Sequence, residues 1–94
     1  MDPQHKPPAM SRKIFNMSLS VETVSVYLLC CSLADSDKVI STKNLLEIWN
    51  STREALFEGL SNLEKKNIIL RIISDQERNN IYKLTDDKSW KLNP

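Results

Sequence analysis

Few side chains in this sequence have a type and spacing that could support catalysis or bind a metal. The single histidine, His5, lies in a proline-rich stretch near the start of the chain. The two cysteines, Cys30 and Cys31, are adjacent, which is neither the CxxC spacing of metal and redox sites nor a geometry that favours a disulfide. We expect both to be small buried side chains in a reducing compartment. With one glycine, the chain also has no glycine-rich loop to hold a phosphate. The sequence therefore predicts no cofactor, no metal site and no enzymatic activity.

A predicted helix from Ser51 to about Lys66 carries the densest set of polar side chains. Ser51 is expected to cap this helix, because Glu54 three positions later completes a capping box. Leucines at helical spacing should face inward, and Gly59 among them indicates a close contact with another helix. The opposite face carries Glu54, Glu58, Ser61, Asn62 and Lys65, and the helix start carries Ser51, Thr52 and Arg53.

Two further helices and a hairpin are expected to position this helix. The first should run from about Val21 to Ala34 and the second from about Thr42 to Trp49, each capped by the serine before it. Residues 39–40 could form a very short strand. Residues 68–74 and 81–85 are rich in β-branched side chains and flank a polar loop, which predicts a hairpin. The predicted fold is mainly α-helical with a small β-hairpin.

Length and composition predict one folded domain of an ordinary soluble type. The chain has 94 residues, of which 40% are hydrophobic and 27% charged, with a net charge of +1. Residues 1–13 contain three prolines and no periodic apolar pattern, so they are expected to form a flexible arm before a domain spanning residues 14–94. No apolar run approaches the ~20 residues needed to cross a bilayer, and no secretory signal is visible. We expect a cytoplasmic protein without membrane contact.

The spacing of apolar residues predicts a core and a second apolar stripe. The expected core consists of Val24, Tyr27, Leu28, Cys31, Leu45, Ile48, Leu56, Leu60, Leu63 and Ile69. Val26, Leu29 and Leu33 form the second stripe on the first helix, roughly opposite the first. Either the chain termini cover this stripe, through Ile14, Phe15 and Trp90, or a second subunit covers it in a homodimer.

Three stretches carry a resemblance to a known family. They are FNMSLSVETVSVYLL at 15–29, VISTKNLLEI at 39–48 and STREALFEGLSNLEKKNII at 51–69. They resemble the N-terminal winged-helix domains of phage replisome-organiser and plasmid replication-initiator proteins. They are similar, more loosely, to small bacterial winged-helix transcription regulators. The resemblance extends from Ile14 to Leu84. It implies a winged helix-turn-helix that binds duplex DNA, with the third helix in the major groove and the hairpin as a wing over the phosphate backbone.

The residues expected to contact DNA lie on the third helix and the hairpin. They are Ser51, Thr52, Arg53, Glu58, Ser61, Asn62, Lys65, Arg71, Arg78 and Lys83. Hydroxyls and helix N-termini suit phosphates, whereas Arg and Asn can hydrogen-bond to base edges. The chain departs from the family pattern at Glu58, where arginine or lysine is usual. Arg53 could equally form an ion pair with Glu54 or Glu58.

Two classes of function remain open at this point. In the first, the protein is a transcriptional or replication regulator that binds duplex DNA, as a homodimer. In the second, it is a winged-helix protein–protein interaction module without DNA binding, in which Glu54 and Glu58 face a basic partner in a replication or transcription complex. A net-positive stripe across the third helix and hairpin would favour DNA. A neutral or acidic stripe beside an exposed apolar patch would favour a protein partner.

Overall fold

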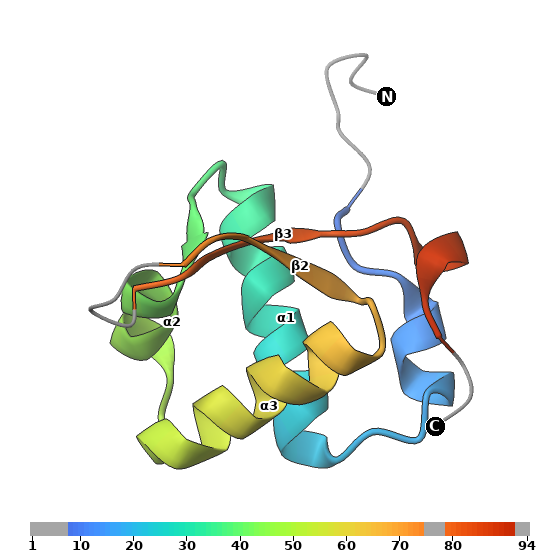
Figure 1. Ribbon diagram of the computed structural model, residues 1–94, viewed down its shortest axis with the longest axis horizontal. Coiled ribbons are helices and arrows are strands. Elements are labelled where there is room, and N and C mark those ends of the chain that lie inside the picture. The colour runs from blue at the N-terminus through green and yellow to red at the C-terminus, as the bar shows by residue number, and fades with distance from the viewer. Residues whose placement is uncertain (1–7, 75–78, 92–94) are drawn as a thin grey trace.

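The computed structural model describes residues 8–74 and 79–91 and folds them into three α-helices and a three-stranded antiparallel sheet (Figure 1). The predicted order, with three helices before a hairpin, is confirmed, and the fold is mainly helical. In chain order the elements are η1 Arg12–Asn16, α1 Val21–Asp35, β1 Ile40–Ser41, α2 Thr42–Ile48, α3 Arg53–Lys65, β2 Ile69–Ile73, β3 Ile81–Leu84 and η2 Asp87–Ser89. In the described part of the chain, no helix combines the length and apolar character that a bilayer crossing requires.

The caps of the first two helices are those that the sequence predicts. The Ser20 hydroxyl accepts from the backbone N–H of Thr23 at 3.1 Å, and the Ser41 hydroxyl accepts from that of Asn44 at 3.0 Å. Each hydroxyl satisfies one of the N–H groups that the first turn of a helix leaves unpaired. The predicted bounds of α1 and α2 therefore agree with the structure to within one residue.

The cap of α3 is Thr52, so the predicted capping box from Ser51 to Glu54 is wrong. The Thr52 hydroxyl accepts from the backbone N–H of Ala55 at 3.1 Å. The indole Nε1 of Trp49 donates to the Thr52 carbonyl oxygen at 2.7 Å and fixes the short segment between α2 and α3. This contact places Thr52 in the extended conformation that an N-cap requires, one residue later than the sequence pattern indicates.

A close contact between α1 and α3 forms the centre of the helical layer, as Gly59 predicts. A Cβ atom on Gly59 would lie 2.7 Å from Cγ2 of Val26, which is far inside ordinary contact distance. Beside it, the Asn62 side-chain amide donates to the hydroxyl of buried Thr23 at 3.1 Å. The glycine therefore allows the two backbones to approach, and an intramolecular hydrogen bond fixes their register.

The sheet has the strand order β1-β3-β2, so β2 lies at an edge. Ile40 pairs with Tyr82 and Ile69 pairs with Leu84, and the inward-facing side chains Ile40, Ile69 and Tyr82 are buried. The pairing of β2 with β3 shifts between Arg71 and Ile73, which is a local bulge. In Figure 1, β3 crosses α1 in its C-terminal half and α3 crosses it in its N-terminal half.

The core differs from the prediction at both α1 and α2. Leu28 and Ile48 are exposed and Val24 is half-buried, whereas the other predicted core residues are buried. Helix α1 is apolar almost all round, so the apolar spacing does not single out its most buried face. Ile48 is the last residue of α2, where the chain leaves the helix.

The second apolar stripe of α1 is covered within the chain. Val26 and Leu33 are buried and Leu29 is half-buried, and Val26 packs on Gly59 of α3. The expected cover by the termini is therefore wrong for Val26, and Phe15 is 60% exposed. A second subunit is not needed to bury these residues.

The segment before η1 is packed on the domain from Ala9 onward. The backbone N–H of Ser11 donates to the Tyr27 hydroxyl at 2.8 Å, and the Ser11 hydroxyl donates to the Asp87 carboxylate at 2.6 Å. The backbone N–H of Ala9 donates to the Asp35 carboxylate at 2.9 Å. These polar contacts hold residues 9–13 on the domain, so they are not part of a flexible arm. Contacts of this kind leave no periodic pattern in the sequence, which is why the sequence did not predict them. Residues 1–7 lie outside the described residues.

Candidate functional site

The outward face of α3 is the surface on which most of the predicted site residues lie. Its inner face is filled by the buried Leu56, Leu60 and Leu63, which pack in the core. On the opposite side the exposed residues are Ser51, Thr52, Arg53, Glu54, Glu58, Ser61 and Lys65. Because the core fixes the rotation of the helix, these side chains are held in solvent along one face, and the N-terminus of α3 is open.

Arg53 lies over an aromatic ring at the start of this face. Its guanidinium carbon is 5.7 Å from the centre of the Phe57 ring, a distance at which a cation is attracted to the ring face. Phe57 is half-buried against the core. The contact holds the charge of Arg53 beside the first turn of α3.

Asn62 does not belong to the outward face. It is half-buried, and its amide nitrogen is used by the Thr23 hydroxyl on α1. The contact gives Asn62 a structural role, the connection of α3 to α1, and its expected contact with a base edge stays a prediction. The helical spacing places it near the boundary between the two faces, and hydrogen-bond partners on another helix are not visible in sequence.

An ion pair connects α3 to the hairpin. Nη2 of Arg71 on β2 lies 3.1 Å from Oε2 and 3.3 Å from Oε1 of Glu64 in the last turn of α3. The hydrogen bond to Glu64 raises the pKa of Arg71. Sequence reasoning selected Arg71 but missed Glu64, because their approach depends on the turn at Asn67, which has a φ of 61°.

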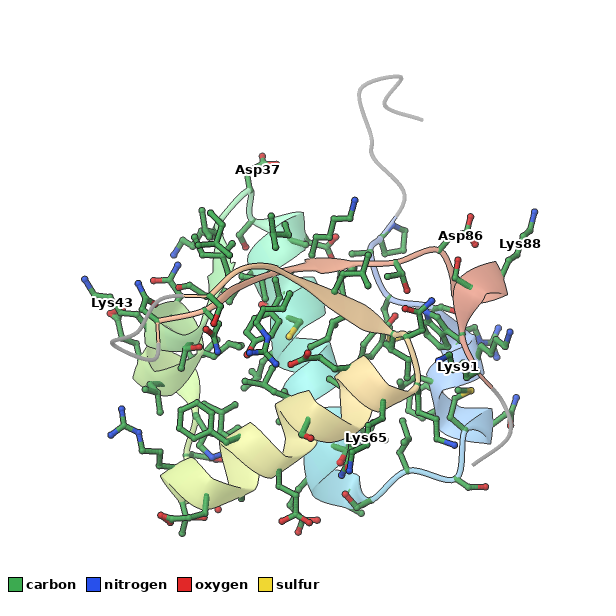
Figure 2. All side chains as sticks on the ribbon, in the orientation of Figure 1. Asp37, Lys43, Lys65, Asp86, Lys88 and Lys91 are labelled. Carbon is green, nitrogen blue, oxygen red and sulfur yellow. The ribbon has the colours of Figure 1, made fainter. Side chains whose placement is uncertain are left out.

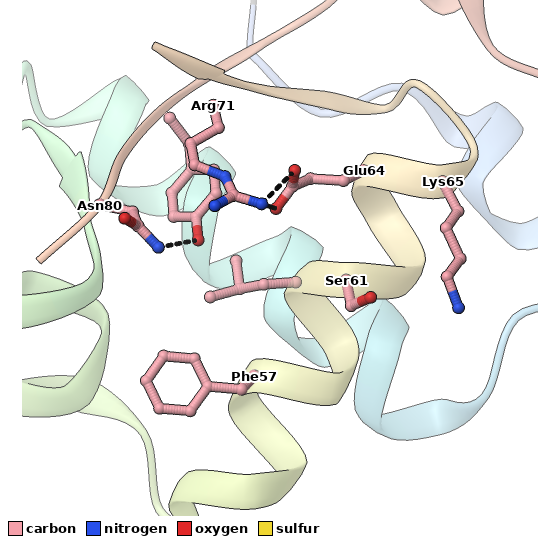
Figure 3. Close-up of a pocket in the computed structure, with 8 residues that line it drawn as sticks. Phe57, Ser61, Glu64, Lys65, Arg71 and Asn80 are labelled. Atoms are coloured by element: carbon pink, nitrogen blue, oxygen red, sulfur yellow. Dashed lines mark hydrogen bonds and ion pairs between the residues drawn. The ribbon is translucent and has the colours of Figure 1, made fainter. Parts of the chain in front are cut away.

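A hollow of about 380 Å³ lies between α3 and the hairpin (Figure 3). Its lining consists of Phe57, Leu60, Ser61, Glu64, Lys65, Arg71, Asn80 and Tyr82. The Asn80 amide donates to the Tyr82 hydroxyl at 3.3 Å. In Figure 3 the Arg71 guanidinium is turned towards Glu64, while the Lys65 side chain extends away from that pair. The hollow therefore combines an aromatic wall with amide, hydroxyl and guanidinium groups.

The start of α2 and the end of the hairpin connection adjoin one another. The backbone N–H of Lys43 donates to the Asn79 side-chain oxygen at 3.3 Å, and the backbone N–H of Thr42 donates to the Asn80 carbonyl oxygen at 2.9 Å. Lys43 extends outward at this corner of the molecule (Figure 2). Lys83 on β3 is also exposed. Arg78, another predicted contact, lies outside the described residues.

The surface formed by α3, β2 and β3 is close to electrically neutral. Its described cations are Arg53, Lys65, Arg71 and Lys83, and its carboxylates are Glu54, Glu58 and Glu64. Leu70, Ile72 and Ile73 of β2 are 43%, 56% and 53% exposed, and Leu70 lies with Lys83 on the face of the hairpin opposite to Arg71 and Tyr82. The charges therefore do not form the net-positive stripe expected of a DNA-binding surface, whereas the exposed apolar strand is the feature expected for a protein partner.

The two cysteines are buried and unreactive. Cys30 and Cys31 are both free thiols, and burial raises their pKa values to about 12 and about 11. A thiol with so high a pKa is a poor nucleophile and metal ligand near neutral pH. Over residues 8–74 and 79–91, no group of three or more His, Cys, Asp or Glu side chains is placed to hold a metal ion.

The surface of α3 and the hairpin is therefore a described region that combines exposed polar side chains, a hollow and an open helix N-terminus. Comparisons with protein-family models, with curated proteins and with solved structures find no match to this chain.

Proposed function

We propose that this chain is a winged helix-turn-helix protein that binds duplex DNA, as a transcriptional or replication regulator rather than an enzyme. In this proposal α3 lies in the major groove and the hairpin of β2 and β3 acts as the wing. One observation carries it: α3 buries its inner face on α1 and leaves its outer face and N-terminus in solvent beside an antiparallel hairpin.

The dimensions of α3 suit a major groove. Its 13 residues give a helix of about 20 Å at the usual rise per residue. The groove is about 12 Å wide and admits one α-helix. Ser51, Thr52 and Arg53 would enter first, where backbone N–H groups and hydroxyls can meet phosphates.

The charges predict a modest affinity for random DNA with a clear salt dependence. We expect the exposed Lys43 and Lys83 to contact phosphates on either side of α3 only if the duplex reaches both α2 and the outer face of the hairpin. Glu54 and Glu58 on the same face repel the polyanion. Specific binding would then rely on base contacts from Arg53 and Ser61, and on two copies placing their helices about one helical turn apart, ~34 Å.

Fluorescence anisotropy of a labelled random duplex at low salt tests this proposal. Arg53→Ala should weaken binding several-fold. Arg12→Ala should not, because Arg12 is an exposed cation on η1, away from the N-terminus of α3 (Figure 1). Glu58→Gln should strengthen binding by removing a repulsive charge. If neither the wild type nor Glu58→Gln binds at tens of micromolar protein, the DNA-binding proposal is wrong.

The exposed apolar strand favours a second candidate function, a protein–protein interaction module that adds a strand to the free edge of β2. We take the partner to be a second copy of this chain. Antiparallel pairing of two β2 strands would place Leu70, Ile72 and Ile73 against the same residues of the partner, as a two-fold interface requires. The only charged residue of β2, Arg71, is already paired with Glu64, so this interface would not bring unpaired like charges together.

Sedimentation velocity without DNA tests this second candidate. If β2 pairs with itself, the wild type should dimerise as its concentration rises, and Ile72→Lys should remain monomeric. Val21→Lys is the matched control, because Val21 is 78% exposed at the other end of α1 from the sheet edge. A wild type that stays monomeric at several hundred micromolar eliminates this candidate.

A further inference from the structure

The ion pair between Glu64 and Arg71 is exposed enough to open. The side chain of Arg71 is 44% exposed and that of Glu64 is 26% exposed. Ion pairs in such surroundings contribute little net stability, because water solvates the separated charges well. The fold does not depend on the pair, since β2 is held to β3 by backbone pairing and to the core by Ile69. Arg71 can therefore exchange partners without loss of the fold.

A phosphate is a competitive partner for this guanidinium. Carboxylate and phosphate both accept two parallel N–H bonds from arginine. The hollow of about 380 Å³ beside the pair offers space for a phosphate, and its lining adds the Ser61 hydroxyl and the Asn80 amide as donors. Arg71 lies where α3 meets the hairpin. In the proposed complex, the phosphate backbone of one DNA strand would pass at this position, between α3 and the hairpin that acts as the wing.

We propose that Glu64 sets the affinity of this surface for DNA by occupying Arg71 until a backbone phosphate replaces the carboxylate. The inference rests on the proposed DNA-binding function and identifies a regulatory residue within the same site. Two effects of Glu64 lower the affinity. Its bond to Arg71 has to break, and its carboxylate then remains close to the incoming phosphate. Removal of the carboxylate should therefore release a phosphate-binding guanidinium.

A double-mutant cycle tests this inference by anisotropy on labelled random duplex over a range of salt concentrations. Glu64→Gln should bind several-fold more tightly than the wild type at low salt. The slope of its log affinity against log salt should stay close to that of the wild type, because Arg71 contacts a phosphate in both complexes. In the Arg71→Ala background, the same Glu64→Gln change should give a smaller gain, close to that of Glu58→Gln, because only the removal of a repulsive charge remains.

Glu58→Gln is the matched control. It removes the same charge from the same helix, but its carboxylate does not line the hollow with Arg71. Its gain in affinity should be equal with and without Arg71. Circular dichroism of each variant checks that the fold is kept, as expected for exposed positions.

The outcomes distinguish a failure of the proposed role of Glu64 from a failure of the proposed DNA binding. If the wild type binds DNA and Glu64→Gln gives no gain, or an equal gain in the Arg71→Ala background, the role of Glu64 is wrong and DNA binding stands. If no variant binds DNA, the proposed function fails and the role of Glu64 fails with it.

Discussion

At the residue scale, chemistry in this protein is determined by what each side chain contacts. Arg53 and Arg71 are both exposed arginines on the candidate surface, but one lies over Phe57 and the other is bound to Glu64. Asn62 has the same chemistry as a base-reading asparagine, and its amide binds Thr23. Residue type was readable from sequence, whereas these partners depend on packing between distant elements.

The buried cysteines predict a loss of stability at alkaline pH. Folding raises the pKa of Cys30 to about 12 and of Cys31 to about 11, against about 8.5 in an unfolded chain. Above pH ~8.5 the unfolded state releases protons that the folded state keeps, so the free energy of unfolding falls as pH rises. We expect a loss of roughly 1 kcal/mol per pH unit for each cysteine between pH 9 and 10.5. Urea denaturation at several pH values measures it. Cys31→Ala should reduce the slope, and a stability independent of pH in this range would contradict the prediction.

At the element scale, sequence patterns located all three helices and missed the start of only one. Serine caps and helical spacing placed α1 and α2 closely, and β-branched runs placed β2 and β3. The start of α3 was missed by one residue, because the Trp49 indole binds the Thr52 carbonyl oxygen and no local pattern encodes that contact. The faces of α1 were misassigned for a similar reason, since an almost uniformly apolar helix is oriented only by its neighbours.

The cap of α3 provides a direct test at this scale. Thr52→Ala removes the hydroxyl that accepts from Ala55 and should lower the free energy of unfolding by ~1 kcal/mol. Ser51→Ala is the control, because Ser51 precedes the cap, and it should change stability by less than ~0.5 kcal/mol. Urea denaturation of both variants measures the difference. Equal losses, or a larger loss for Ser51→Ala, would restore the capping box that the sequence predicts.

At the scale of the whole molecule, the first and last described segments complete the domain. Residues 9–13 bind Tyr27 and Asp87, and the last described segment returns to the C-terminal end of α3, where the Lys91 backbone N–H donates to the Lys66 carbonyl oxygen at 2.8 Å. The segments that make these contacts, residues 9–13 and 85–91, lie outside the stretch from Ile14 to Leu84 for which the sequence predicts a winged helix-turn-helix. They cover the side of α1 that α3 and the sheet leave open, so the folded unit extends beyond the segment that motifs alone indicate.

Trp90 holds the C-terminal described segment on the core. Its ring meets Tyr27 edge to face, with centres 5.6 Å apart and planes at 86°, and its Nε1 donates to the Thr85 hydroxyl at 3.0 Å. Trp90→Ala removes a buried aromatic side chain and should lower the free energy of unfolding by ~3–5 kcal/mol. Trp90→Phe keeps the aromatic contact and loses the hydrogen bond, so a loss of only ~1–2 kcal/mol is expected. Urea denaturation gives both values, and hydrogen exchange reports whether residues 9–13 lose protection. If Trp90→Ala unfolds at the same urea concentration as the wild type, the C-terminal segment does not belong to the cooperative unit.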